Sequence, residues 1–192
     1  MHKGLLYYHP GIYNIVGRLY YRKRWIFRYC EVAQYISPGD RVLELCAGDG
    51  VLKEYLPHND YTGLEFNPVF VNYGIKKGRN LVLADVLSYP FPKSDVIIMI
   101  SSFYHFINKP LRIVNKMKEF CQKKIIVCEN YKCLSTAPNK WLSNLGKVLS
   151  ATHLGTGNRR WAEDDLVSFF KENNFSKIYC KNDYVFGVWE NR

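Results

Sequence analysis

The sequence lacks a long apolar run. Its longest strictly aliphatic stretch covers residues 96–100, far short of the roughly 20 residues that a membrane-spanning helix needs. The apolar stretch at residues 4–8 is too short for the core of a signal peptide, and His9 and Pro10 follow it directly. We therefore expect a soluble, cytoplasmic protein.

The sequence also lacks closely spaced cysteine pairs and Cys-His clusters. Its six cysteines are spread along the chain, at Cys30, Cys46, Cys121, Cys128, Cys133 and Cys180. Zinc sites group such ligands a few residues apart, and a chain of 192 residues is long enough to fold without a disulfide framework. We expect reduced thiols and no metal site.

No internal repeat, low-complexity tract or Gly/Ser-rich linker interrupts the chain. Its 192 residues correspond to about 1.3 domains of typical size, which predicts a single domain over residues 1–192. With 47% hydrophobic and 16% aromatic residues, the chain can bury a sizeable core. This composition excludes an intrinsically disordered protein.

Acidic residues are scarce relative to basic ones. The chain has 17 Asp and Glu against 27 Lys and Arg, a formal net charge of +10. Residues 1–41 hold seven basic and two acidic residues, so this first fifth contributes +5, half of the surplus. The charge therefore points to a polyanionic or acidic partner of the amino-terminal region, such as a nucleic acid or an anionic membrane.

Strand-like and helix-like apolar patterns alternate along the chain. Residues 96–100 form a continuous aliphatic run, which is typical of a strand buried on both faces of a parallel sheet. Strands are predicted at residues 41–46, 61–66, 80–84, 95–101, 124–129, 175–180 and 184–189, and helices at about 12–36, 51–56, 68–76, 109–122, 138–151 and 162–173. The alternation predicts an α/β fold: a doubly wound, Rossmann-like sheet of seven mostly parallel strands with a terminal antiparallel hairpin and helices on both faces.

A glycine-rich turn follows the first predicted strand, in the run VLELCAGDG at residues 42–50. Gly48 and Gly50 permit positive φ angles and let a ligand approach the backbone, and the following helix offers unpaired N–H groups. Glu65 ends the second strand and Asp85 follows the third, so both carboxylates are expected at the carboxyl edge of the sheet. Glu65 is suited to accept both ribose hydroxyls and Asp85 an adenine amino group, which predicts an adenosine site.

Four segments, in their order along the chain, resemble the motif set of class I S-adenosylmethionine-dependent methyltransferases. They are VLELCAGDG, YTGLEFN, LADVLSYPFP and DVIIMISSFYHF. The resemblance implies S-adenosylmethionine as cofactor and S-adenosylhomocysteine as product. It implies a cofactor site made of Glu44, Cys46, Gly48, Asp49, Gly50, Glu65, Phe66, Asn67, Asp85, Val86 and Ser101. Cys46 departs from the family pattern, because it stands where the family usually has its first glycine.

Two other interpretations of the glycine turn stay open. A nicotinamide-dinucleotide site requires Gly-x-Gly-x-x-Gly, and counting from Gly48 the third position is Lys53. That fingerprint is incomplete, and it gives Glu44 no role. The glycines alone would also make a simple tight turn, which leaves the other three segments without an explanation.

Candidates for catalysis follow the fourth and fifth predicted strands. A sulfonium methyl donor is a strong electrophile, so the enzyme has to align the acceptor and, for O, N or activated C acceptors, take up a proton. The candidates are His105, Tyr104 and Glu129, and His105 is preferred because an imidazole pKa near 6.5 suits proton transfer at neutral pH. A structural or cofactor-shielding role for His105, and an ion-pair or helix-terminus role for Glu129, are the alternatives.

The amino-terminal helix region, residues 1–40, is predicted to lie outside the catalytic sheet. At about 100° per residue, one stripe of this helix is apolar and is expected to face the core: Ile12, Ile15, Leu19, Ile26, Cys30 and Ala33. An adjacent stripe holds Arg18, Arg22, Trp25 and Tyr29, with Arg24 and Arg28 on the far side. The basic and aromatic stripe is predicted to bind a phosphate-bearing acceptor or an anionic membrane, or to be a solvated face.

Substrate contacts are expected from both accessory regions, at Tyr13, Arg22, Tyr131, Arg159 and Arg160. Residues 131–161 are predicted to form a lid-like insertion or acceptor wall. Small family members with a basic and aromatic amino-terminal helix resemble methyltransferases of lipid-like or quinone-like molecules. The resemblance therefore favours methyl transfer to a small hydrophobic or amphiphilic acceptor, on a protein that contacts a membrane surface peripherally.

An RNA methyltransferase is the less favoured alternative. Its support is the basic charge and the aromatic residues, which would stack on bases, but the chain has no recognisable RNA-binding module. A non-catalytic S-adenosylmethionine-binding protein is the third hypothesis. The sequence makes no prediction of the oligomeric state.

Overall fold

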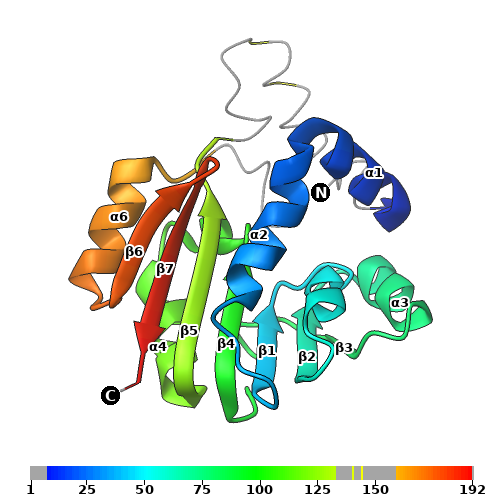
Figure 1. Ribbon diagram of the computed structural model, residues 1–192, viewed down its shortest axis with the longest axis horizontal. Coiled ribbons are helices and arrows are strands. Elements are labelled where there is room, and N and C mark those ends of the chain that lie inside the picture. Colours follow the sequence, from blue (N-terminus) through cyan, green and yellow to red (C-terminus); the bar gives the residue numbers. More distant parts are fainter. Residues whose placement is uncertain (1–7, 133–139, 141–143, 145–158, 192) are drawn as a thin grey trace.

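The computed structural model describes residues 8–132, 140, 144 and 159–191. Within them the chain forms a seven-stranded sheet in the order β3-β2-β1-β4-β5-β7-β6 (Figure 1). The strands are β1 (Arg41–Leu45), β2 (Asp60–Glu65), β3 (Leu81–Leu83), β4 (Ser94–Ile100), β5 (Cys121–Asn130), β6 (Lys177–Lys181) and β7 (Tyr184–Glu190). In the described part of the chain, β7 alone runs antiparallel to its neighbours. The predicted fold class and all seven strands are confirmed, with ends shifted by a few residues.

Five α-helices and two 3₁₀ helices are described. They are α1 (Pro10–Tyr21), α2 (Lys23–Ala33), η2 (Val51–Tyr55), α3 (Pro68–Lys76), η3 (Phe103–Phe106), α4 (Pro110–Phe120) and α6 (Glu163–Glu172). The helices predicted near 68–76, 109–122 and 162–173 are confirmed, and the one predicted at 51–56 is 3₁₀. The helix predicted at 138–151 lies outside the described residues. No described helix is long and apolar enough to cross a membrane.

The prediction of one helix over residues 12–36 is wrong. The chain breaks at Arg22, whose φ of 48° and ψ of −127° are not helical, and this residue separates α1 from α2. The break lets Trp25 fold back onto Gly17, where an added Cβ would lie 2.4 Å from the Trp25 ring. Two turns of a straight helix would hold these residues about 12 Å apart along the axis. The apolar periodicity of the sequence continues through residue 22, but the packing of the Trp25 indole against Gly17 requires the helix to break there.

The predicted core stripe of this region is also wrong, except at Ala33, which is partly buried and packs against the core. Ile12, Ile15 and Leu19 are 50%, 59% and 72% exposed, and Ile26 and Cys30 are exposed as well. Trp25 and Tyr29, placed at the margin, are buried in the core, together with Arg28. The wheel assumed one continuous helix, so the adjacent stripe that it drew through the break combines exposed Arg18 and Arg22 with buried aromatic residues.

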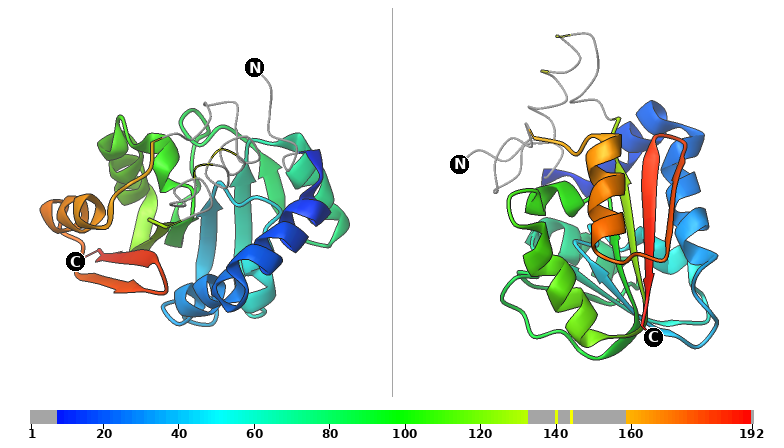
Figure 2. Two further views of the ribbon diagram at one scale, coloured as in Figure 1. Left: turned by 90° about the horizontal axis from the view of Figure 1, so that it is seen from above. Right: turned by 90° about the vertical axis from the view of Figure 1, so that its left-hand side faces the viewer.

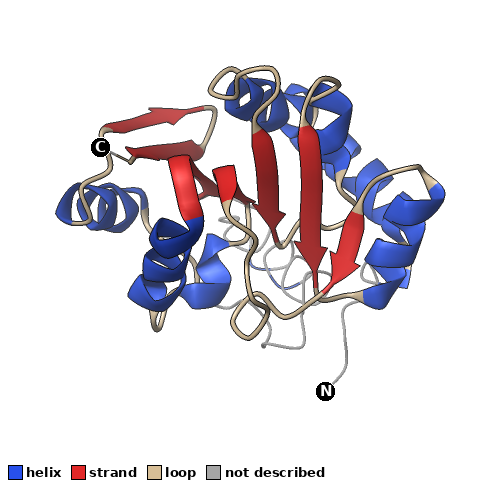
Figure 3. Ribbon diagram, turned by 90° about the horizontal axis from the view of Figure 1, so that it is seen from below, coloured by secondary structure: helices blue, strands red, loops and turns tan. Residues whose placement is uncertain are grey.

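Helices cover both faces of the sheet (Figures 2 and 3). Alternate residues of β1 divide between two apolar clusters: Leu43 and Leu45 join one, and Val42 joins the other. The first cluster contains the inward sides of α4 and α6, and the second contains those of α2 and α3. This double cover explains the continuous apolar run of β4, which is buried on both faces.

Candidate active site

The site is built where the strand order reverses. β1 pairs with β2 on one side and β4 on the other, and the crevice beyond such a pair is the usual ligand site of a doubly wound sheet. The chain leaves β1 through Cys46 at a φ of 55° and leaves β4 through Ser101 at a φ of 53°. Both residues therefore take the left-handed conformation that favours glycine. Gly48 and Gly50 share it, at 58° and 75°.

Glu65 connects the end of β2 to the glycine turn. One carboxylate oxygen accepts the N–H of Gly48 and the other accepts the N–H of Asn67, each at 2.8 Å. Burial raises the pKa of Glu65, while these backbone N–H groups lower it. Each carboxylate oxygen keeps a further lone pair for an incoming hydroxyl. The turn and the carboxylate are thus held in one arrangement.

The other residues predicted to surround adenosine line the same edge. Asp85 is exposed and its Oδ1 accepts the N–H of Leu87 at 2.9 Å, while Val86 is buried. Phe66 follows Glu65 and is 44% exposed. Asn67 is buried and its side chain accepts the N–H of Val69 at 3.1 Å, which caps α3 as the Asn-Pro sequence predicts.

Glu44 is buried inside the β1 strand, on the α2 side of the sheet. The hydroxyl of Tyr61 donates a hydrogen bond to its Oε2. Burial raises the pKa of Glu44 to about 8, and Arg28 acts in the opposite direction. A cationic group next to this carboxyl would favour its ionised form.

Asp49 ties the glycine turn to α1 and to Arg79. Its Oδ2 accepts hydrogen bonds from Asn14 Nδ2 and Arg79 Nη1, both at 2.9 Å. Arg79 also donates to the Asp49 carbonyl at 2.7 Å and pairs with Glu54. The Asp49 carboxylate therefore connects the glycine turn to α1 and to Arg79.

Arg28 lies against the turn after β4, and the sequence-based prediction did not include it among the site residues. Its side chain is 5% exposed, lies 4.0 Å from the Trp25 ring centroid, and donates to Ser101 Oγ at 3.0 Å and to Tyr29 OH at 2.8 Å. No described ion pair includes it, and its Nε has no hydrogen-bond partner among the described residues. The sequence gives little indication that a charged residue in an amphipathic helix is buried. The three aromatic residues in the segment 25–29 are the one feature that could have suggested it.

Glu129 supports the turn after β4. Its Oε2 accepts the N–H groups of Phe103 and Tyr104 at 2.6 and 3.2 Å, and its Oε1 accepts that of Asn130 at 3.2 Å. Burial raises the pKa of Glu129 to about 7. Its carboxylate thereby holds η3, the short helix that presents Tyr104 and His105. His105 is half-buried against the Tyr104 ring, with centroids 3.9 Å apart.

The predicted substrate residues divide into two groups. Arg160 stacks 3.4 Å from the Tyr104 ring centroid, and Tyr13 packs edge-on against Trp25 and Phe70, so both lie at the site. Tyr131 is half-buried after β5, and burial together with Glu163 raises its pKa to about 12. Arg22 is exposed at the helix break, and Arg159 is exposed and donates to Asn108 at 3.0 Å. These two arginines are not brought into the cluster. Of the predicted lid, residues 133–139, 141–143 and 145–158 lie outside the described part.

A family model described as methionine biosynthesis protein MetW matches residues 27–175. This match covers well over half of the chain. The chain belongs to the MetW family. No curated protein sequence matches it.

Solved structures with the same fold are S-adenosylmethionine-dependent methyltransferases. A Thermotoga maritima enzyme, described as a possible histamine N-methyltransferase, has a TM-score of 0.66 at 12% identity and covers 97% of this chain and 98% of its own. Magnesium protoporphyrin IX methyltransferase from Synechocystis, with bound S-adenosylmethionine, has a TM-score of 0.58 at 13% identity over 92% of this chain and 81% of its own. The plantazolicin methyltransferase BpumL, in complex with S-adenosylhomocysteine, has a TM-score of 0.59 at 14% identity. The match covers 85% of this chain and 80% of BpumL. This MetW-family chain thus has the class I methyltransferase fold.

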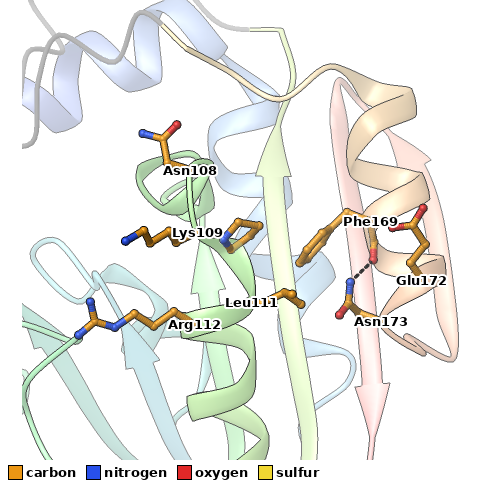
Figure 4. Close-up of a pocket in the computed structure, with 8 residues that line it drawn as sticks. Asn108, Lys109, Leu111, Arg112, Phe169, Glu172 and Asn173 are labelled. Carbon is orange, nitrogen blue, oxygen red and sulfur yellow. Dashed lines mark hydrogen bonds between the residues drawn. The ribbon is translucent and has the colours of Figure 1, made fainter.

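A separate surface hollow of about 620 Å³ lies between the start of α4 and the end of α6 (Figure 4). It is lined by Asn108, Lys109, Pro110, Leu111, Arg112, Phe169, Glu172 and Asn173. None of the predicted site residues lines it. This hollow is therefore distinct from the site at the glycine turn of this family member.

Proposed function

We propose that the protein is an S-adenosylmethionine-dependent methyltransferase acting on a small hydrophobic or amphiphilic acceptor. The observation that carries the proposal is the Glu65 carboxylate, held at 2.8 Å from the N–H groups of Gly48 and Asn67 beside the glycine turn. A fixed acid at the end of the second strand is suited to a ribose diol. The fold and the MetW family support the same reaction class.

The adenosine end of the cofactor is assigned to the β2 and β3 ends. Glu65 accepts the ribose hydroxyls, Phe66 and Val86 contact the adenine faces, and Asp85 accepts its amino group. Asn67 acts by capping α3 and Asp49 by fixing Gly48 and Gly50, so these two residues position the turn. Their role is to shape the site rather than to bind the ligand directly.

The methionine end is assigned to the edge between β1 and β4. Glu44 lies beneath it, and the backbone of Cys46 and Ser101 borders it. Arg28 supplies a buried cation whose Nε lacks a partner among the described residues, and a carboxylate would satisfy both its charge and this donor. This assignment places the acid beside the ammonium and the guanidinium beside the carboxylate of the amino-acid part.

Bound S-adenosylmethionine supplies an electrophilic methyl group. The chain's task is then to orient the acceptor, to exclude water and to take up a proton. His105 is the proposed base, with Tyr104 and Arg160 forming the wall beside it. Glu129 has its oxygens directed at three backbone N–H groups, which supports a positioning role for this predicted catalyst.

The acceptor side has an aromatic character, since Tyr13 packs against Trp25 and Phe70, and Tyr104 contacts His105 and Arg160. This supports a hydrophobic or amphiphilic acceptor, with Arg160 able to face an anionic group. An RNA acceptor and a non-catalytic cofactor-binding protein remain as alternatives, to be separated by experiment.

The test is calorimetric titration with S-adenosylhomocysteine. Glu65→Gln is expected to weaken binding about 10- to 100-fold, because it removes a charged acceptor of two hydrogen bonds. The matched control is Glu190→Gln, an exposed carboxylate near the opposite end of the sheet, where it pairs in register with Lys124. Equal affinity of Glu65→Gln and the wild type would sink the assignment.

The acceptor class is tested by transfer of a labelled methyl group to lipid, RNA and protein fractions of a cell extract. Label in the lipid fraction supports the proposed acceptor, and label in RNA alone contradicts it. A protein that binds the cofactor but labels no fraction would be the non-catalytic alternative. His105→Gln, with unchanged cofactor affinity, is expected to lower the rate of methyl transfer.

A further inference from the structure

The α1 helix turns its apolar side to solvent. Its inward side is made of Tyr13, of Asn14, which bonds Asp49, and of Gly17, which receives the Trp25 ring. Its outward side carries Ile12, Ile15 and Leu19, spaced i, i+3 and i+7 along one stripe. We call these three residues the α1 stripe. A helix on a protein surface normally places such residues toward the core.

This arrangement is not a scatter of single apolar residues, which is common on protein surfaces. Three large aliphatic side chains lie on adjacent turns of one helix and are each at least half exposed. If α1 were turned so that these side chains faced the core, the Trp25–Gly17 and Asn14–Asp49 contacts would be lost. The exposed stripe is therefore a consequence of how α1 is anchored over the site.

The charged residues of the segment 8–30, which contains the α1 stripe, have one sign. Residues 8–30 contain no Asp or Glu. Arg18, Arg22 and Lys23 are exposed, the first on the flank of the stripe and the other two at the helix break. Arg24 pairs with Asp183 and Arg28 is buried, so the exposed positive charge of this segment belongs to the first three.

Apolar residues bordered by cations fit the surface of an anionic bilayer. The aliphatic side chains would enter the boundary between acyl chains and headgroups, while the cations meet lipid phosphates. A second copy of the chain fits poorly, because pairing two stripes would bring like charges together. A nucleic acid would satisfy the cations but leave the three aliphatic side chains in water.

We propose that the α1 stripe docks on an anionic membrane, with Ile12, Ile15 and Leu19 inserted at the interface and Arg18, Arg22 and Lys23 on the headgroups. α1 lies beyond the carboxyl ends of the strands (Figure 1), so docking places the site next to the bilayer. Delivery of an amphiphilic acceptor from the membrane rests on the proposed function. The docking itself does not.

The test is flotation of the full-length protein, without cofactor, on vesicles of phosphatidylcholine alone and of phosphatidylcholine mixed with phosphatidylglycerol. Wild type is expected to bind the anionic vesicles only. The double variant Ile15→Ser/Leu19→Ser is expected to bind about tenfold more weakly or worse. Its control is Ile75→Ser/Leu111→Ser, which changes two aliphatic residues on α3 and α4 that are 52% and 50% exposed.

The contribution of charge is tested with the double variant Arg18→Gln/Lys23→Gln. Its control is Lys76→Gln/Lys171→Gln, which removes two exposed cations elsewhere on the protein. Each cation at the docked surface raises the affinity for anionic vesicles about fivefold, so Arg18→Gln/Lys23→Gln is expected to bind about 25-fold more weakly than its control. In addition, Leu19→Trp is expected to shift its fluorescence to the blue on anionic vesicles, and Leu111→Trp is not.

Equal binding of the stripe variant and its control, or an absent shift of Leu19→Trp, overturns the proposal. So does self-association in sedimentation that disappears in Ile15→Ser/Leu19→Ser, since a second copy would then be the occupant. Because no cofactor is present, failed docking leaves the methyltransferase assignment intact. An inactive enzyme equally leaves the docking result intact.

Discussion

The two faces of the sheet are covered by different chemistry. On the α4–α6 face, Ile113, Leu166 and Phe170 are fully buried among other apolar side chains. On the α1–α2 face, Arg28, Glu44 and Asp49 are buried among aromatic rings close to the carboxyl edge. Burying polar groups lowers stability unless each finds a partner. Both faces bury a large apolar cluster, and what distinguishes the α1–α2 face is the pair of opposite charges, Arg28 and Glu44, buried beside the site.

The largest expected contrast is between the same substitution on the two faces. Leu166→Ala on α6 removes a fully buried side chain and is expected to cost about 2–5 kcal/mol in the free energy of unfolding. Leu19→Ala on α1 removes an exposed side chain and is expected to stay within about 0.5 kcal/mol of the wild type. Urea denaturation measures both. Similar costs for the two variants would mean that the α1 stripe is covered in solution.

A smaller effect is expected from pH, because Glu44 is buried on the α2 side. Its pKa is raised by burial to about 8, so the folded chain binds its proton more tightly than the unfolded chain. The stabilisation is complete below the unfolded pKa and is lost as the pH rises toward 8. The free energy of unfolding should thus fall by a few kcal/mol between about pH 5 and 8.

Glu44→Gln separates this effect from that of Glu129, whose pKa is raised to about 7 and which acts in the same direction. The variant is expected to flatten the decline, above all between pH 7 and 8. Denaturation curves at matched ionic strength provide the measurement. A decline as steep as in the wild type over this interval would show that Glu44 ionises freely in the folded state.

The smallest expected effect concerns Arg28 and is seen only with a ligand. Arg28→Met is expected to weaken S-adenosylhomocysteine about 10- to 100-fold, through loss of a charged hydrogen bond to its carboxylate. Methylthioadenosine lacks the amino-acid part and should bind equally to both proteins. Arg41→Met, at the exposed ion pair with Asp95, is the control. Equal loss of both ligands would make Arg28 a purely structural residue of the α2 face.

The sheet was predictable because its signals are local. The run at residues 96–100 and the glycines after β1 identify their elements, and Asn67 with Pro68 places the start of α3 correctly. The four segments that end or follow β1, β2, β3 and β4 are brought to one edge by topology alone, so the predicted cofactor residues could be grouped before their contacts were known. What those contacts do in binding and catalysis stays a prediction.

The amino-terminal region was not predictable in the same way. A helical wheel defines stripes but not the direction of the core, and the break at Arg22 depends on Trp25 meeting Gly17 in three dimensions. η3 was missed because residues 103–106 are too short for a period. The burial of Arg28 follows from aromatic packing that no spacing rule contains.

Cys46 and Ser101 end two paired strands in a backbone conformation that costs a side-chain-bearing residue about 1–2 kcal/mol each. Glycine would avoid this cost but would leave each turn free to sample many shapes. The two turns would then lose this conformational freedom when a ligand binds, which costs entropy. With the two turns already restricted, association should carry a small conformational entropy penalty, and amide exchange at residues 46–50 should change little when a ligand binds.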